Sequence, residues 1–462
     1  MIFKQRVLIL SVITVLLLPI IGNSQEVLVL DLDRSVDLAL KNNPSIRMAE
    51  KELSKARAGV WESVSNILPH LDGSVSFQKA WAIQETVIPN FIKMMLPPGT
   101  PGLELYPDYV RVAFGIENTF RYGASVTQPL FLGGAGIAGV QVAMAARDAA
   151  ELNLEEQRQQ LIYQTADAFY LCLLTKELVK VQEEAMAQAQ ANLENVIKKY
   201  DVGMASGFDK MRAEVEAANL QPELIAAKNN YQTALTQLKT ILGLKREALI
   251  EVQGQLEYVN DEFGDMPLEE IQRLALKDRP VVRALSEQKY MAQKGIALAR
   301  SNFLPKLFFQ TDYSYMAMRN DYKFRQDDFS KGFTSSLSLQ IPLFKGFKSA
   351  AQFHQAQLDF KKMLDSEKQV YDGIAAEAEM AYNKFQEARQ KYLSARQTVD
   401  LAQEALRLAN LMYDEGMNTQ LDVLNSQLAL TRAKLNYANS VYEYQKARYQ
   451  LRKATGKLSS VL

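Results

Sequence analysis

The spacing of hydrophobic and polar residues changes repeatedly along this chain, and each change predicts a new element. Apolar and small residues recur every three or four positions over 44–68, which favours a helix with proline at both ends. Alternation with period two then predicts two strands within 70–131. Helical spacing returns over 136–200 and, after a short break, over 208–242. At about 1.5 Å per residue, the longer of these helices reaches about 97 Å.

The second half of the chain repeats this order of elements. The stretch that ends at Pro44 matches the stretch that ends at Pro280, an offset of 280 − 44 = 236 residues. Gly203 matches Gly416 at an offset of 416 − 203 = 213 residues. Because the offset changes only once, a single insertion of 236 − 213 = 23 residues distinguishes the two halves. We therefore predict a twofold internal repeat.

The duplication sets the boundaries that we expect. The predicted segments are a signal peptide (1–24), repeat 1 (25–245, β-hairpin 70–131, tip at Gly203) and repeat 2 (246–462, β-hairpin 306–344, tip at Gly416). Each hairpin precedes a long helix and a return helix, which in repeat 2 cover 349–414 and 421–455. The insertion lies in the first hairpin, where five prolines and the apolar stretch 91–96 predict a variable surface loop.

Three further features refine this outline. Lys4 and Arg6 precede an apolar run over 7–21, so we expect an export signal cleaved after Ser24; without a cysteine there, we expect no lipid anchor at that junction. Pro222 should kink the return helix of repeat 1 because it lacks an N–H. The segments 26–33 and 249–258 have some strand character and should pack around the helices.

Composition removes several functional classes. Lysine plus arginine and aspartate plus glutamate number 53 each, so no net field favours nucleic acid as a partner. The single cysteine, Cys172, lies in an apolar helical context and is expected to be a core thiol. His70 and His354 have no acidic cluster around them, and the glycine-rich stretch 133–136 lacks the lysine of a phosphate-binding loop. We expect no cofactor, no metal site and no catalytic site, and therefore a non-enzyme.

The two tips are the best-matched points of the repeat. Each has the sequence Tyr-Asp-x-Gly-Met, in which the glycine predicts a left-handed helix C-cap. Ser206 and Asp209 follow the first tip, and Thr419 and Asp422 follow the second, as capping boxes that open the return helices. The simplest interpretation of both aspartates is therefore helix capping.

The strands carry the first functional indication. Each has one apolar face and one hydroxyl-rich face, as expected for strands between lipid and water. Four strands cannot close a barrel, and an open edge is not tolerated in lipid. The chain must therefore supply its strands to an oligomer, and a trimer would give 3 × 4 = 12 strands. A closed barrel continued by a hollow cylinder of helices would be a conduit.

The repeat and the tip motif over 413–424, Tyr-Asp-x-Gly followed by Leu-Asp-Val-Leu, resemble the TolC family of outer membrane efflux proteins. The resemblance implies a membrane β-barrel plus an α-helical barrel, built as a homotrimer with a 12-stranded barrel and a long helical tunnel. It places the barrel in the lipid of the cell outer membrane and the tunnel in the periplasm. It also implies docking to a periplasmic adaptor (a membrane fusion protein) and an inner-membrane pump, so that the duct conducts passively.

The resemblance also suggests how the periplasmic entrance is built. Asp422 matches a carboxylate ring that lines the pore, and Asn425 stands where a second aspartate often follows. Tyr413 and Asp209 match the tyrosine and aspartate of a latch that closes the entrance. Asn418 replaces the arginine of that latch, which would remove a charge-assisted hydrogen bond of about 1.5–3 kcal/mol. We therefore expect a weaker latch and a less acidic mouth.

The residues beside the tip glycines have two interpretations. Met204 and Met417, with Phe208 and Leu421, either pack the helical hairpins or contact the adaptor, since methionine suits adaptable interfaces.

A protein of another class remains an alternative to the duct. A secreted coiled-coil tether would conduct nothing and would have no period-two segments, and an enzyme on a helical scaffold ranks after it. Ion conductance in a planar bilayer distinguishes the duct from the tether.

Overall fold

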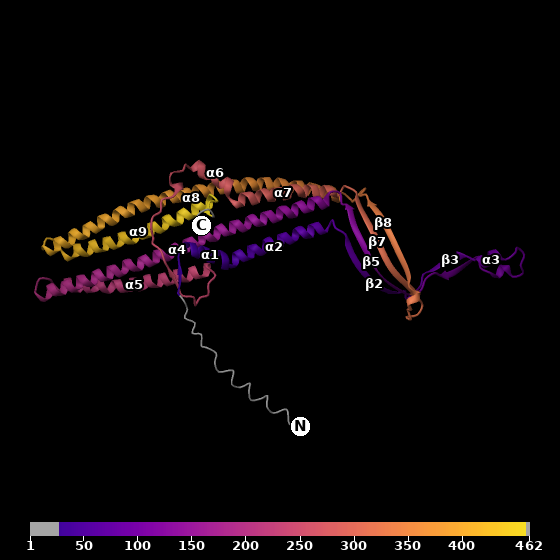
Figure 1. The fold of residues 1–462 in the computed structure, drawn as a ribbon, viewed down its shortest axis with the longest axis horizontal. Helices are drawn as coiled ribbons and strands as arrows, with labels where there is room; N and C mark the ends of the chain where they lie inside the picture. Colours follow the sequence, from indigo (N-terminus) through magenta and orange to yellow (C-terminus); the bar gives the residue numbers. More distant parts are fainter. Residues whose placement is uncertain (1–26, 459–462) are drawn as a thin grey trace, which may run out of the picture. The chain divides into compact units, whose positions relative to one another are not determined.

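Helix-forming sequence dominates the chain, and the computed structural model, which describes residues 27–458, follows it (Figure 1). The main helices are α2 (Pro44–Ser65), α4 (Ala135–Asp201), α5 (Gly207–Ile241), α7 (Pro280–Ser301), α8 (Lys348–Asp414) and α9 (Gln420–Ala454). Every predicted bound of the long and return helices is confirmed within one residue. The expected signal peptide lies outside the described residues. Pro222 lies inside α5, which continues through it to the predicted end.

Two short helices were not predicted, α1 (Leu32–Asn42) and α6 (Leu268–Asp278). Asn43 and Arg279, which precede Pro44 and Pro280, have extended backbones with ψ of 130° and 132°. The proline ring disfavours the helical conformation of the residue before it, so each helical stretch is divided in two. The strand character expected over 26–33 is therefore limited to β1 (Leu28–Leu30), which pairs in parallel with β6 (Ile250–Val252).

The alternating segments form one four-stranded antiparallel sheet. Its strands are β2 (His70–Lys79), β5 (Asn118–Phe131), β7 (Lys306–Arg319) and β8 (Ser330–Gln340). The order is β2-β5-β7-β8, so the two hairpins are joined through β5 and β7. The strand predicted to reach 344 ends at Gln340, before Pro342, which cannot donate to the ladder. In β5 the matching Pro129 is accommodated by a shift of register.

The sheet has two chemically different faces. The register aligns Val75, Tyr122 and Tyr315 across three strands, and the same face carries Phe77, Phe120 and Phe333. The opposite face carries Asp72, Ser74, Ser76, Arg121, Ser125, Thr127, Gln310, Asp312, Ser314, Thr334, Ser336 and Ser338. Large apolar side chains of the first face are exposed in the single chain, such as Val75 at 73% and Leu337 at 65%. Among the described residues, aromatic rings of the β7–β8 connection, such as Phe329 against Phe120 and Tyr122, cover one end of this face, whereas Val75 and Leu337 stay exposed.

The insertion is structured, which corrects the expectation of a surface loop. Residues 85–113 form a second antiparallel pair, β3 (Glu85–Pro89) with β4 (Tyr109–Ala113), and the short helices α3 (Phe91–Met95) and η1 (Leu103–Leu105) lie between them. Asn90 is buried and caps α3, and its side-chain amide also donates to the carbonyl of Pro107 at 3.0 Å. We call residues 85–113 the arm; it extends from the end of β2 and β5, away from the sheet (Figure 1).

Contacts divide the chain into two units. One comprises Lys51–Leu152 and Arg283–Val370, and contains the sheet and the arm. The other comprises the described residues up to Glu50, with Asn153–Val282 and Tyr371 onward, and contains both tips. In this second unit α4 lies beside α5 and α8 beside α9 (Figure 1).

A segment without helical pattern, residues 253–267, crosses α8 and α9 in the second unit, and we call it the strap. Helical side chains satisfy its backbone: Tyr444 and Gln445 donate to the carbonyls of Val259 and Glu257 at 2.8 and 2.6 Å. Its Asp261 side chain is fully buried and accepts hydrogen bonds from the Nε atoms of Arg448 and Arg452 at 2.6 and 2.8 Å. Side chains 185 to 191 positions away thus hold the strap in place.

Candidate functional site

Both tips are tight turns made by a left-handed glycine. Gly203 has φ of 77° and Gly416 has φ of 72°, as the sequence predicts. The residue after each glycine donates back into the last helical turn: Met204 to the carbonyl of Lys199 at 2.7 Å, and Met417 to the carbonyl of Met412 at 2.8 Å. This six-to-one hydrogen bond is the Schellman type of helix end. The two tips therefore present the same backbone geometry with different side chains.

The capping boxes are confirmed. Asp209 accepts from the backbone and hydroxyl of Ser206 at 3.2 and 2.6 Å, and Asp422 accepts from those of Thr419 at 3.0 and 2.6 Å. The hydroxyl of Thr419, followed by its backbone N–H, holds the pKa of Asp422 below its usual value. Asp422 is exposed, so its capping role leaves a charged carboxylate facing solvent at neutral pH.

The two tips are joined by a residue that sequence reasoning missed. The Nζ of Lys199, at the end of α4, lies 3.6 Å from Oδ1 of Asp414 and 3.9 Å from the centre of the Tyr413 ring, both at the end of α8. Desolvation raises the pKa of Tyr413, and the charges of Asp209 and Asp414 raise it further, so its hydroxyl stays protonated. Among the described residues, Asp209 bonds to its own cap and not to Tyr413.

The remaining predicted entrance residues lie nearby with different surroundings. The Asn418 amide donates to the sulfur of Met412 at 3.8 Å, within its own tip. Asn425 is exposed and follows Asp422 by three positions, so the two share a helix face. Gln420, at the first position of α9, is 4% exposed, and both polar atoms of its amide lack a partner among the described residues. Its burial was not predicted, because nothing in the local sequence distinguishes it from a surface glutamine.

The apolar tip residues are on the surface of the single chain. Met204 is 78% exposed, Met417 67%, Phe208 66% and Leu421 46%. Of the two interpretations, packing within the hairpins therefore does not describe them here. Exposed apolar side chains gathered at one end of a helix pair are typical of an interaction surface.

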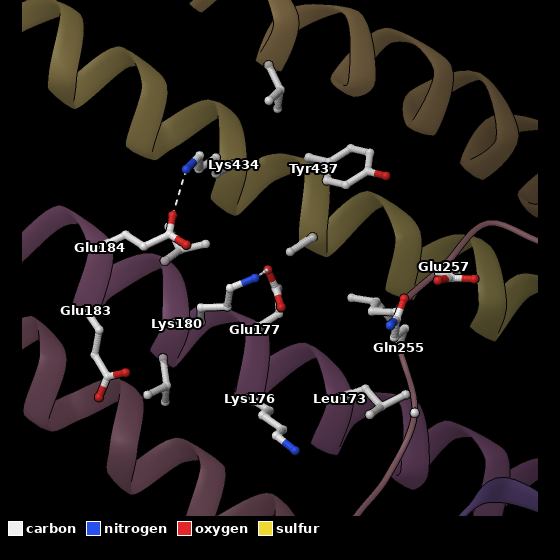
Figure 2. Close-up of a pocket in the computed structure, with 16 residues that line it drawn as sticks. Leu173, Lys176, Glu177, Lys180, Glu183, Glu184, Gln255, Glu257, Lys434 and Tyr437 are labelled. Atoms are coloured by element: carbon white, nitrogen blue, oxygen red, sulfur yellow. Dashed lines mark hydrogen bonds and ion pairs between the residues drawn. The ribbon is translucent and has the colours of Figure 1, made fainter. Parts of the chain in front are cut away.

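Away from the tips, the described residues offer little for chemistry. Figure 2 shows a groove of about 780 Å³ between α4, the strap and α9. Two of its lysines pair with glutamates of the lining, Lys434 with Glu184 at 2.7 Å and Lys180 with Glu177 at 3.5 Å, so much of its charge is already balanced. Burial raises the pKa of the Cys172 thiol to about 12, which confirms an inert core thiol. Within 27–458, no cluster of histidine, cysteine or acidic residues is arranged to hold a metal.

Comparison with known families decides the identity. The model of the outer membrane efflux protein family matches residues 35–244 and 272–457, which include both tips and all four strands of the sheet. The chain belongs to this family. CzcC, a cobalt-zinc-cadmium resistance protein of Cupriavidus metallidurans, is 23% identical over 396 residues, covering 86% of this chain and 82% of the relative. AprF, an alkaline protease secretion protein of Pseudomonas aeruginosa, is 23% identical over 402 residues, covering 84% and 76%.

The fold agrees with the family. The crystal structure of the Campylobacter jejuni CmeC outer membrane channel matches with a TM-score of 0.75 at 21% identity, covering 92% of this chain and 86% of that one. The protein is therefore an outer membrane efflux protein of the TolC type, located in the outer membrane. The family is one of efflux proteins, and the matched CmeC structure is that of an outer membrane channel. Among its described helices, none combines the length and apolarity needed to cross a membrane.

Proposed function

We propose that three copies of this chain close one 12-stranded barrel and form the exit duct of a tripartite export system. The observation that carries the proposal is the open sheet: β2 and β8 are its outer strands, and each has an edge without a partner strand among residues 27–458. Unpaired backbone groups cannot remain in lipid. Because β2 and β8 run in opposite directions, β8 of one copy can pair with β2 of the next in the same antiparallel pattern.

The faces of the sheet support this closure. The exposed apolar face would contact lipid, and the face with Asp72, Arg121 and Asp312 would line a water-filled lumen. The helices would continue the duct through the periplasm. Substrate would arrive from an inner-membrane pump through a periplasmic adaptor, and conduction through the duct would be passive.

The tips would form the periplasmic entrance of this duct. Three copies of Asp422 would make a carboxylate ring that favours cations, and Asn425 would make the next ring polar without charge. The latch across the two tips would rest on Lys199 with Tyr413 and Asp414, in place of the arginine that Asn418 replaces. An exposed ion pair and a cation–π contact each contribute about 0.5–1 kcal/mol, so we infer a weak latch.

The exposed methionines beside Gly203 and Gly416 would contact the adaptor. Site-specific photocrosslinking from Met204 and Met417 to a co-expressed adaptor tests this. A crosslink from either position supports it, and its absence from both, with a crosslink elsewhere on the tips, contradicts it.

The duct is tested by conductance together with a seam crosslink. In a Cys172→Ala chain, cysteines replace Leu71 or Val75 on β2 in combination with Phe333 or Leu337 on β8, so that several registers are sampled. We expect at least one pair to give a covalent trimer in the outer membrane and purified protein to conduct in a planar bilayer. Val126→Cys on the interior strand β5, combined with the same β8 positions, is the matched control. Monomers without conductance would favour the tether.

A further inference from the structure

The arm has an apolar surface that its own residues do not cover. Met95 is 86% exposed, Leu105 87%, Phe91 59% and Val87 58%, on α3, η1 and β3. A two-stranded hairpin alone in water is at best marginally stable, because it cannot bury enough apolar area. The arm therefore needs a partner surface to hold this conformation.

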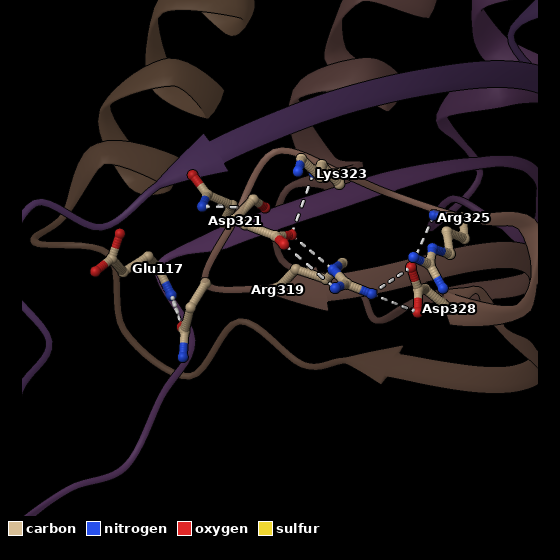
Figure 3. Close-up of polar contacts among 8 residues, drawn as sticks. Glu117, Arg319, Asp321, Lys323, Arg325 and Asp328 are labelled. Atoms are coloured by element: carbon tan, nitrogen blue, oxygen red, sulfur yellow. Dashed lines mark hydrogen bonds and ion pairs between the residues drawn. The ribbon is translucent and has the colours of Figure 1, made fainter.

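The base of the arm is fixed. On one side, Lys79 donates to the hydroxyl of Tyr322 at 2.7 Å, and on the other, the Glu117 N–H donates to Oδ1 of Asn320 at 3.1 Å. Both acceptors belong to the β7–β8 connection. Figure 3 shows that connection closed on itself, with Arg319 between Asp321 and Asp328 at 2.7 and 3.0 Å. The arm thus leaves the sheet at a defined place. The β7–β8 connection, its counterpart in the second half, forms ion pairs among its own charged side chains.

The lipid surface is a poor partner for the arm. A membrane barrel strand needs about 9–11 residues to cross the apolar layer, and β2 already has 10 before the arm begins. The arm continues away from the sheet beyond that length (Figure 1). Its residues include three acids and two bases, and Lys93 is already paired with Asp108 at 2.7 Å. It therefore has no basic cluster for anionic headgroups.

The position of the arm favours a second copy of the same chain. β2 is an outer strand of the sheet, so under the proposed function its free edge is the seam between copies. Five residues separate the end of this strand from the arm, so the arm extends from the end of the sheet at which the seam strand stops. Three arms would stand at the same height around one axis.

We propose that the apolar surfaces of the three arms, around Met95 and Leu105, pack against one another above the barrel and form a contact between copies at its external end. This rests on the proposed trimer. The contact buries side chains that each chain alone leaves in water, and it stabilises the β3–β4 pair.

Crosslinking in the outer membrane of cells that express the full chain tests the proposal. With Cys172→Ala, the variants Met95→Cys and Leu105→Cys are treated with a mild oxidant or a short bis-maleimide. We expect covalent dimers, because three equivalent cysteines at one axis can join only in pairs. Asp327→Cys, exposed on the closed β7–β8 connection at the same end of the sheet, is the matched control and should remain monomeric.

A second measurement needs no cysteine in the arm. In seam-crosslinked trimers, trypsin should cut the arm at Lys93 or Arg111 at least tenfold faster in a Met95→Ser, Leu105→Ser double variant than in the unchanged arm. Equal cleavage rates in the double variant and the unchanged arm would overturn the proposal. Seam-crosslinked trimers in which the arm cysteines form no crosslink would also overturn it. Quenching of a fluorophore at Met95→Cys by brominated lipid would assign the arm to lipid, and an adduct of another mass would assign it to a different protein. Loss of the seam crosslink itself would instead reject the proposed trimer.

Discussion

Asp261 is the residue whose replacement should affect the strap most. Its carboxylate is fully buried, accepts from Arg448 and Arg452 through Oδ2, and accepts the N–H of Phe263 through Oδ1 at 3.1 Å. Both arginine side chains are only 11% exposed. Asp261→Asn keeps the shape and an acceptor oxygen, but removes the only negative charge that is fully buried between these two cations.

The expected magnitude follows from burial. Removing one partner of a buried ion pair costs about 3–5 kcal/mol, because the remaining charge is left uncompensated. Asp265, four residues later in the same strap, provides the matched control: its side chain is 85% exposed and lies 3.4 Å from Arg389. An exposed pair contributes about 0–1 kcal/mol. Asp265→Asn should therefore have little effect.

Hydrogen–deuterium exchange of the purified protein measures both variants. At about 1.4 kcal/mol per factor of ten, a loss of about 3 kcal/mol should increase exchange of strap amides near Phe263 by about 100-fold. Asp265→Asn should change it by less than about fivefold. If the two variants exchange at the same rate, the buried pair does not hold the strap, and the assignment of its stability to Asp261 is wrong.

The same carboxylate gives the sign of a pH effect. Burial raises the pKa of Asp261, but the hydrogen bonds from Arg452 and Arg448 outweigh it, and the net pKa lies below the usual value. A carboxyl with a lowered folded pKa stabilises fully above its unfolded value of about 3.9, and this contribution disappears as pH falls through the folded value. The protection of strap amides against exchange that Asp261 provides should thus be constant from pH 7 to 5. It should decline below about pH 4. Asp261→Asn should remove that decline.

Three further outcomes concern the tips and the sheet. Lys199→Gln should weaken closure by about 1–2 kcal/mol per copy and raise the open probability in planar bilayers, whereas Lys198→Gln, exposed on the same turn, should not. Asp422→Asn should lower the cation preference and the block by multivalent cations; if both stay unchanged, the carboxylate ring is rejected. Gly123→Ala places a Cβ 2.6 Å from the Tyr313 carbonyl and should destabilise the β5–β7 pair by about 1–3 kcal/mol, whereas Gly73→Ala meets open space and should leave the melting temperature unchanged.

Features that repeat in the sequence could be predicted, because helix periodicity, strand alternation and glycine caps are local. The bounds of α4 and α8 and the capping boxes at Asp209 and Asp422 follow from such patterns. The start of α2 at Pro44 also follows from the local rule that the residue before proline disfavours the helical conformation.

Contacts between distant segments could not be predicted. Lys199 reaches Asp414 from 215 positions away, since 414 − 199 = 215, and no local pattern marks that pair. The strap was predicted only in part: its course depends on hydrogen bonds from side chains of α9, as from Tyr444 to the carbonyl of Val259, which no local pattern marks. The five prolines and the apolar stretch 91–96 predicted a variable surface loop, and the pairing of β3 with β4 around α3 was not part of that prediction.

The meeting of the two chain ends has a consequence for biogenesis. Val36 of α1 packs in one cluster with Ile162, Ala166 and the C-terminal residues Tyr449 and Leu458, and β1 pairs with β6 about 220 positions later. Contacts between segments so far apart in the sequence form late, because closing the long loop between them costs conformational entropy before the contact stabilises it. The N-terminal segment, which emerges first during export, must therefore wait for the last segment. β1 lacks its partner until β6 emerges, and the face of α1 that carries Val36 stays partly uncovered until Tyr449 and Leu458 emerge, so we expect the chain to depend on holdase chaperones in the periplasm.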